Sequence, residues 1–330
     1  MTTTATETNP AAKKSLSAPK HSKVGHFLAE NGALVGLVVL CIALFIATPN
    51  FLTTQNLLNV GIQSATTAIL AFGMTFVIVT AGIDLAVGSI AALGAMVSAY
   101  MFTNIGLPGI VTLLIGLLVG LLAGVISGIG VAYGKLPAFI ATLAMMSVAR
   151  GLTLVLSDGR PIPTAPEVNF LGSYIGPVPV PVIMLAVAGV VCWFILSRTV
   201  LGRSMYAVGG NLEAARLSGL PVKRTLVSVY ALSGLFAGFA GLLIAGRLSS
   251  AQPGAATGYE MDAIAAVVIG GASLAGGSGK ASGTLVGALL LAVIRNGLNI
   301  LNVNSFWQQV VIGCVIAVAV GIDVLRRKND

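Results

Sequence analysis

The polar residues that could bind a solute or a partner lie in a few short segments of an otherwise apolar chain. The longest covers residues 198–224 and contains Asn211, Glu213 and Arg216. An asparagine at this position can cap a short helix by accepting a backbone N–H bond, and Gly219 can end it. We therefore expect a short capped helix with one acidic and one basic side chain, which a soluble partner could grip.

A second polar set follows helical spacing inside an apolar run. Arg295, Asn299 and Asn302 stand at positions i, i+4 and i+7, which form one face of a helix. Polar side chains on a membrane-buried helix usually face protein or water rather than lipid. The guanidinium and the amides could hydrogen-bond the hydroxyl groups of an uncharged solute, or they could join neighbouring helices. The sequence leaves both interpretations open.

Two isolated ionisable residues have structural interpretations. Asp84 lies between apolar runs, and a charge deep in a bilayer costs at least about 2.5–3.5 kcal/mol. We therefore expect Asp84 at the membrane interface or at a helix N-terminus, where the helix dipole favours it. Arg150, one turn from the outer end of its predicted span, is expected to extend to the outer surface.

A polar insert separates two late apolar runs over residues 246–262. We expect it outside the cell, where long ordered loops often carry function. It could dock a delivery protein or shape an outer gate. The candidate docking residues are Arg247, Gln252, Tyr259 and Glu260.

The chain contains no recognisable catalytic or cofactor-binding constellation. The glycine-rich stretch over residues 270–280 resembles a phosphate loop, but Ala281 follows Lys280 where Ser or Thr is required. The three cysteines have spacings that suit neither a metal site nor a disulfide framework. We predict that the chain is not an enzyme, holds no cofactor or metal, and binds no nucleotide through a standard motif.

Composition indicates a membrane protein. Of the 330 residues, 56% are hydrophobic and 8% charged, with a mean hydropathy of +0.99, whereas soluble domains carry roughly a quarter charged residues. Because a spanning helix needs about 20 apolar residues, we expect an all-α polytopic membrane protein with about ten transmembrane helices. The expected spans are 30–48, 58–80, 86–103, 109–132, 138–156, 180–197, 225–246, 262–274, 283–301 and 306–324.

These spans form one membrane domain over residues 28–325. Residues 1–27 have the composition of a disordered cytoplasmic tail, and residues 326–330 form a short cytoplasmic tail. The net charge is +8, but the basic residues gather in the tails and in segment 198–224. The positive-inside rule places these regions and both termini in the cytoplasm, and the distribution argues against a nucleic-acid partner.

Glycines recur every four residues in several spans. Gly116, Gly120, Gly124 and Gly128 lie on one face of the fourth span. Gly234 and Gly238 repeat the pattern in the seventh span, and Gly283 and Gly287 repeat it in the ninth. Small faces let helices approach closely in lipid, either as tight static packing or as a surface that slides during transport.

Seven stretches together resemble the permeases of monosaccharide importers driven by ATP-binding-cassette (ABC) ATPases, and those for ribose in particular. They cover residues 82–89, 137–143, 201–203, 211–219, 247–253, 258–262 and 269–277. The resemblance extends over nearly all of residues 30–325. Segment 211–219 is similar to the coupling loop of such permeases, in a variant that reads Asn-Leu-Glu-Ala-Ala-Arg.

The resemblance implies a permease subunit in the bacterial inner membrane. Its partners would be membrane lipid, a second permease subunit that forms a homodimer with it, cytoplasmic ABC ATPases, an extracytoplasmic sugar-binding protein and a monosaccharide, with ribose expected first. The ATPases would act on the loop through Asn211, Glu213, Ala214, Ala215, Arg216 and Gly219. Other cargoes remain open, namely another pentose, a hexose or a furanosyl signalling sugar. An ion-coupled symporter would need Asp84 and Arg295, and both it and a passive channel would leave the loop without a purpose.

Overall fold

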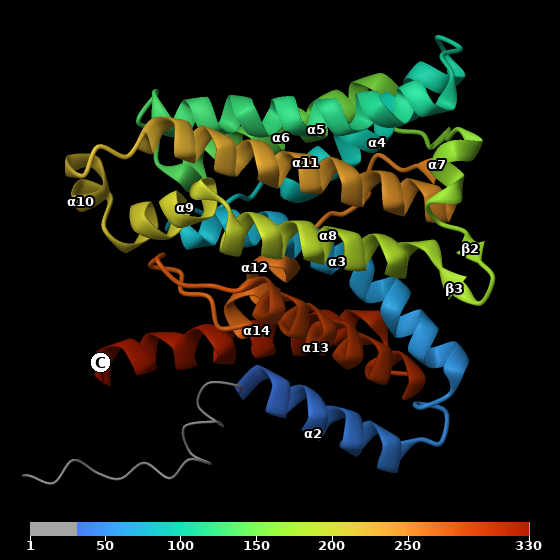
Figure 1. Cartoon of the computed structure of the whole chain (residues 1–330). Helices are drawn as coiled ribbons and strands as arrows, with labels where there is room; N and C mark the ends of the chain where they lie inside the picture. Colours follow the sequence, from blue (N-terminus) through green and yellow to red (C-terminus); the bar gives the residue numbers. More distant parts are fainter. Residues whose placement is uncertain (1–31, 330) are drawn as a thin grey trace, which may run out of the picture. The chain divides into compact units, whose positions relative to one another are not determined.

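The computed structural model describes residues 32–329, and the predicted tail over residues 1–27 lies outside this part. The described chain is almost entirely helical (Figure 1). Its helices are α2 (Gly32–Ala47), α3 (Thr54–Val79), α4 (Val87–Thr103), α5 (Gly109–Ala132), α6 (Ala138–Ser157), α7 (Pro166–Phe170), α8 (Val180–Arg198), α9 (Val200–Gly210), α10 (Leu212–Leu217), α11 (Val222–Leu248), α12 (Tyr259–Ile269), α13 (Ala281–Ile300) and α14 (Ser305–Asn329). Its strands are β1 (Ile162–Pro163), β2 (Tyr174–Ile175), β3 (Val178–Pro179) and β4 (Ser250–Ala251).

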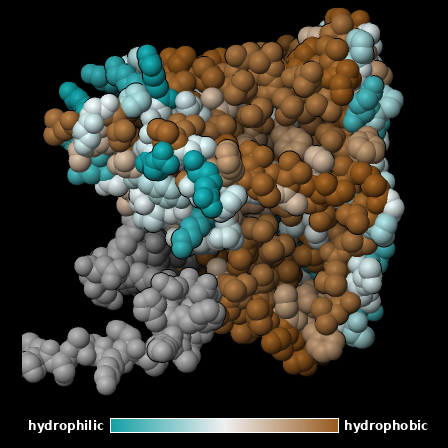
Figure 2. Space-filling view, in the orientation of Figure 1, coloured by the Kyte–Doolittle hydropathy of each residue, from teal (hydrophilic) through white to brown (hydrophobic). Residues whose placement is uncertain are grey.

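Long apolar helices make up most of the described chain. Six of them, α3, α5, α6, α8, α11 and α13, are long and apolar enough to cross a membrane. Shorter apolar helices are α2, α4 and the Ser305–Val318 part of α14. Figure 2 shows a broad hydrophobic band between hydrophilic ends, one of which holds α9 and α10. The fold is therefore an all-α polytopic membrane protein, as the composition predicts.

The predicted eighth span differs most from the structure. Helix α12 has 11 residues and rises about 16 Å, which is too short for a hydrocarbon core of about 30 Å. The predicted span over 262–274 is therefore helical only as far as Ile269. Gly271 adopts a positive φ angle just after the helix ends and stops its continuation, and Gly276 and Gly277 also have positive φ angles further along.

Close glycine contacts hold the middle of the bundle together. A Cβ on Gly120 would overlap the carbonyl oxygen of Gly234, and a Cβ on Gly124 would overlap that of Tyr230. The glycine face predicted for α5 therefore lies against α11, and the two helices approach to backbone contact. The same device joins α13 to α12, where Gly287 faces the carbonyl oxygen of Ala266.

Asp84 lies in the segment between α3 and α4, just before the first turn of α4. Its Oδ1 accepts a hydrogen bond from the Ala86 N–H at 2.9 Å, and its Oδ2 accepts one from the Ser233 hydroxyl at 2.8 Å. The side chain is completely buried within the bundle, and its depth relative to the membrane interface stays a prediction. The expected place at a helix N-terminus agrees with the structure.

Two segments that are distant in sequence meet at the end opposite α10. Strand β1 pairs with β4, which joins the segment after α6 to the segment after α11. Arg150 on α6 donates hydrogen bonds to the carbonyl oxygens of Pro253 and Ala255, at 2.7 and 3.1 Å. Its guanidinium is thus bound to the insert, and the side chain keeps an intermediate exposure. The expected extension of Arg150 to the outer membrane surface stays a prediction.

Candidate functional site

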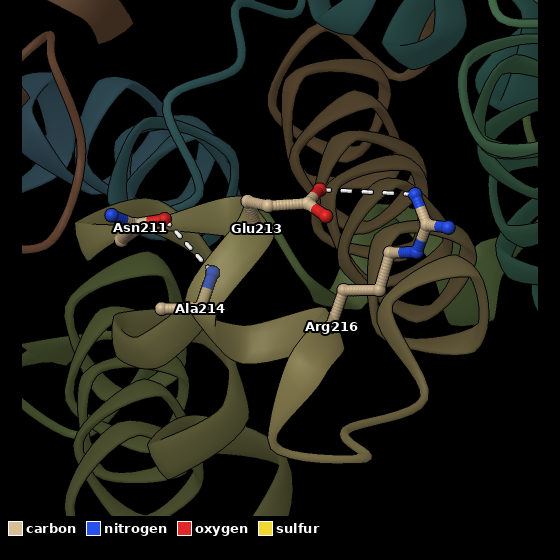
Figure 3. A network of polar contacts seen from close by, with 4 residues as sticks. All are labelled: Asn211, Glu213, Ala214 and Arg216. Carbon is tan, nitrogen blue, oxygen red and sulfur yellow. Dashed lines mark hydrogen bonds and ion pairs between the residues drawn. The ribbon is translucent and has the colours of Figure 1, made fainter.

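The short helix predicted in segment 198–224 is α10. The Oδ1 of Asn211 accepts a hydrogen bond from the Ala214 N–H at 2.9 Å and caps the helix (Figure 3). Gly219 follows the helix with a φ of 78°, which a glycine adopts without strain. The chain can therefore reverse sharply here and enter α11. The capping residue and the turn residue are the two that the sequence singled out.

Helix α10 exposes nearly all of its side chains. Glu213 and Arg216 lie 3.7 Å apart and are 62% and 73% exposed (Figure 3). Ala215 is buried, whereas Leu217 is 80% exposed. Sequence reasoning did not single out Leu217, although a helix this short buries only one face and Ala215 takes it. An apolar side chain beside a weakly paired arginine makes a contact surface that a partner protein can cover.

The helix before α10 connects this surface to the bundle. Tyr206 of α9 donates a hydrogen bond to the Gly279 carbonyl oxygen at 2.7 Å. Burial raises the pKa of the Tyr206 phenol, which keeps the donor protonated. In the same region, the Gly277 N–H donates to the Val79 carbonyl oxygen at 2.9 Å. A displacement of α9 therefore acts directly on the glycine-rich segment and on the end of α3.

A polar pocket of about 230 Å³ lies among α3, α11, α12, α13 and α14. Its lining contains an ion pair in which Arg295 Nη2 lies 2.7 Å from Asp262 Oδ2. The guanidinium also lies 6.0 Å from the centre of the Tyr259 ring. The polar lining is Gln63, Thr67, Arg247, Tyr259, Asp262, Arg295, Asn299 and Gln308, and the apolar lining is Leu291 and Ala292.

Of each predicted polar set, the pathway candidates and the docking candidates, only some residues line the pocket. Arg295 and Asn299 line the pocket, whereas Asn302 lies beyond the end of α13 and does not. Among the docking candidates, Arg247 and Tyr259 also line the pocket. These four residues share one site, although the sequence assigned them to two.

The other two docking candidates lie elsewhere. Gln252 donates a hydrogen bond to the Ser250 hydroxyl at 2.9 Å. Glu260 lies against the first turn of α4, where a Cβ on Gly88 would be 2.6 Å from its Oε2. Two of the four docking candidates therefore line the pocket and two do not, and their part in docking stays a prediction.

Sequence reasoning missed half of the polar lining. Gln63 and Thr67 are one turn apart on α3, a spacing that could have indicated a polar face. Asp262 and Gln308 carried no such signal, because only the fold brings them to Arg295 and Asn299. No group of three potential metal ligands occurs within residues 32–329.

Taken together, the apolar helical bundle and its exposed terminal helix define a polytopic membrane protein. Residues 56–320 match the family model described as the permease component of branched-chain amino acid transport systems. The match covers most of the chain, which therefore belongs to this family of transport permeases. The chain is thus a transport subunit of the cell membrane, and not an enzyme.

Individual relatives are similar over almost their whole length. The ribose import permease of Bacillus subtilis is 48% identical over 90% of this chain and 93% of its own. That of Haemophilus influenzae is 45% identical over 91% of this chain and 95% of its own. The D-allose transport system permease of Escherichia coli is 39% identical over 88% of this chain and 91% of its own. No solved structure matches the chain.

Proposed function

We propose that the chain is the transmembrane permease of an ATP-driven importer that carries a monosaccharide, and that the sugar is ribose. The observation that carries the proposal is 45–48% identity to two ribose import permeases over about nine-tenths of the chain. The family description names branched-chain amino acids, but it covers a wider group than these relatives. The D-allose permease, at 39% identity, makes a hexose the second candidate.

The energy for transport comes from separate ATPase subunits, which act on α10. The sequence has a glycine-rich stretch without the Ser or Thr of a nucleotide-binding loop. Helix α10 offers the surface that such a subunit needs, since Glu213, Arg216 and Leu217 are all exposed. Asn211 and Gly219 fix the shape of that surface, Ala214 leaves room for close approach, and Ala215 anchors it.

The orientation follows from the charges and from the number of crossings. Ten crossings put α10 and both termini in the cytoplasm, in agreement with the positive-inside rule. Helix α12 and the glycine-rich segment together make the eighth crossing. The end that carries β1, β4 and α7 then faces outward and receives sugar from an extracytoplasmic binding protein.

A second copy of the permease completes the transporter. Helices α2, α6 and α14 carry large apolar side chains that are exposed in the single chain, among them Ile46 at 79%, Val155 at 74% and Phe306 at 79%. Lipid or another permease subunit has to cover them. We propose a homodimer.

An ion-coupled mechanism receives no support from the candidate residues. Asp84 is bound to Ser233 and to the Ala86 amide, and Arg295 is bound to Asp262. Each ionisable group therefore has a partner within the fold, as expected for structural roles.

Reconstituted uptake tests the proposal. Liposomes would contain the permease, its ATPase and a ribose-loaded binding protein, and uptake of labelled ribose would be measured with and without ATP. We expect ATP-dependent uptake that is lost in Glu213→Lys and in Gly219→Pro, because proline cannot adopt the positive φ at position 219. Gly210→Ala is the matched control, since nothing lies within 4 Å of a Cβ there. Uptake that does not depend on ATP and survives both changes would contradict the proposal.

A further inference from the structure

The pocket among α3, α11, α12, α13 and α14 has the chemistry of a solute site. We propose that this pocket binds one uncharged monosaccharide during its passage through the transporter, with the Arg295–Asp262 pair in its lining. The inference rests on the proposed function and adds a place where the sugar is held. It uses groups that come from five different helices.

The first argument is the supply of hydrogen-bonding groups. The Gln63 amide and the hydroxyl groups of Thr67 and Tyr259 line the pocket, and none of them is among the fully buried polar atoms that lack a partner within residues 32–329. These groups are therefore reachable from the pocket, where polar groups at membrane depth need water or a solute as a hydrogen-bond partner. A bound molecule with many hydroxyl groups, or water in its place, would supply the missing partners.

The second argument is the charge of the pocket. Asp262 and Arg295 neutralise each other at 2.7 Å, and Arg247 is an exposed side chain that stays hydrated. A paired arginine still has free N–H groups, and a paired carboxylate still has free lone pairs. Both can hydrogen-bond a neutral hydroxyl without leaving a charge unpaired. The pair offers no separate anion and cation sites of the kind that a zwitterion needs.

The third argument is size and surface. The volume of about 230 Å³ lies below the roughly 300–1,000 Å³ of pockets that hold drug-sized ligands, which suits a single sugar ring. Among residues 32–329, Leu291 and Ala292 are the only aliphatic side chains in the lining. A branched-chain amino acid would find little apolar surface there, whereas the Tyr259 ring offers a flat face to a sugar.

Gln308 closes the pocket from α14. Its amide N–H groups donate to Asn299 Oδ1 at 2.7 Å and to the Val303 carbonyl oxygen at 2.9 Å. Within residues 32–329 these bonds use neither the Gln308 carbonyl oxygen nor the Asn299 amide nitrogen, which are available to a solute. The neighbouring Gln309 is exposed and lies outside the lining, so the two glutamines form a matched pair.

The test compares glutamine-to-leucine variants in the reconstituted transporter. Gln63→Leu removes a pocket amide without breaking a hydrogen bond among the described residues, Gln308→Leu removes a second, and Gln309→Leu is the control. Ribose uptake and the ATP hydrolysis stimulated by the loaded binding protein are both measured. We expect uptake to fall about tenfold in each pocket variant, the factor that corresponds to about 1.4 kcal/mol. Stimulated ATP hydrolysis is expected to persist, and Gln309→Leu is expected to match the wild type.

The outcomes separate this inference from the proposed function. Wild-type uptake with unchanged uptake in both pocket variants overturns the pocket and leaves the importer standing. An equal loss in Gln309→Leu, or a parallel loss of uptake and ATP hydrolysis, also overturns it, because the pocket would then have no special part in handling sugar. A wild-type transporter that moves no ribose contradicts the proposed function itself.

Discussion

Two arginine–carboxylate pairs, one on the exposed helix α10 and one in the pocket, show how burial gives the same residue types different roles. On α10, Glu213 and Arg216 are 3.7 Å apart and both largely exposed. In the pocket, Asp262 and Arg295 are 2.7 Å apart, with side chains 7% and 32% exposed. Exposed pairs contribute about 0–1 kcal/mol, whereas removal of one partner from a buried pair costs about 3–5 kcal/mol. The exposed pair, Glu213–Arg216, is thus free to exchange partners. The buried pair, Asp262–Arg295, holds helices α12 and α13 around the pocket.

The largest effect on stability is expected from breaking the buried pair, Asp262–Arg295. Asp262→Leu leaves Arg295 unpaired, and we expect a loss of about 2–3 kcal/mol, below the value for a fully buried pair because Arg295 keeps some exposure. Denaturant unfolding in mild detergent measures it. The control is Asp262→Leu with Arg295→Met, which removes both charges and should recover most of the loss. A double variant no more stable than the single one would contradict this role.

An intermediate effect is expected at the exposed surface of α10, on function alone. Leu217→Asp places a charge where a partner is proposed to dock, and we expect ribose uptake and stimulated ATP hydrolysis to fall together by about tenfold, equivalent to about 1.4 kcal/mol. Stability should not change, because Leu217 is 80% exposed. Leu217→Met keeps the apolar contact and serves as the control. Loss of uptake alone would show that α10 does not govern ATP hydrolysis.

The smallest effect is expected from breaking the exposed pair, Glu213–Arg216. Arg216→Ala should change the free energy of unfolding by less than about 0.5 kcal/mol, because an exposed i,i+3 pair is screened by water and salt. The same denaturant titration, at low and at high salt, measures the change. A salt-dependent loss above about 1 kcal/mol would mean that the two pairs are more alike than their exposure indicates.

The features that sequence predicted best depend on neighbours along the chain. The cap at Asn211 and the turn at Gly219 are local, so residue type and spacing were enough. The glycine face of α5 was also visible, because a four-residue spacing repeats on one side of a helix. The glycines of α11 show the same four-residue spacing, and the structure packs the two glycine faces against each other.

The features that sequence missed depend on contacts across the fold. Gln63, Asp262 and Gln308 belong to three different helices, and nothing in their local spacing links them to Arg295. The length of α12 was overestimated because apolar residues extend past Ile269, while the glycines beyond it favour a non-helical path. Asp84 looked too costly to bury, but Ser233 and the Ala86 amide supply the hydrogen bonds that a buried carboxylate needs.

The most direct test of this division of work is the number of sugar molecules carried per ATP hydrolysed. It would be measured in liposomes for the wild type, Gln308→Leu and Leu217→Asp. If the pocket handles sugar and α10 transmits the action of the ATPase, Gln308→Leu lowers the ratio, whereas Leu217→Asp lowers both rates and leaves the ratio unchanged. An unchanged ratio in Gln308→Leu, or a lower ratio in Leu217→Asp, would contradict the separation of the two regions.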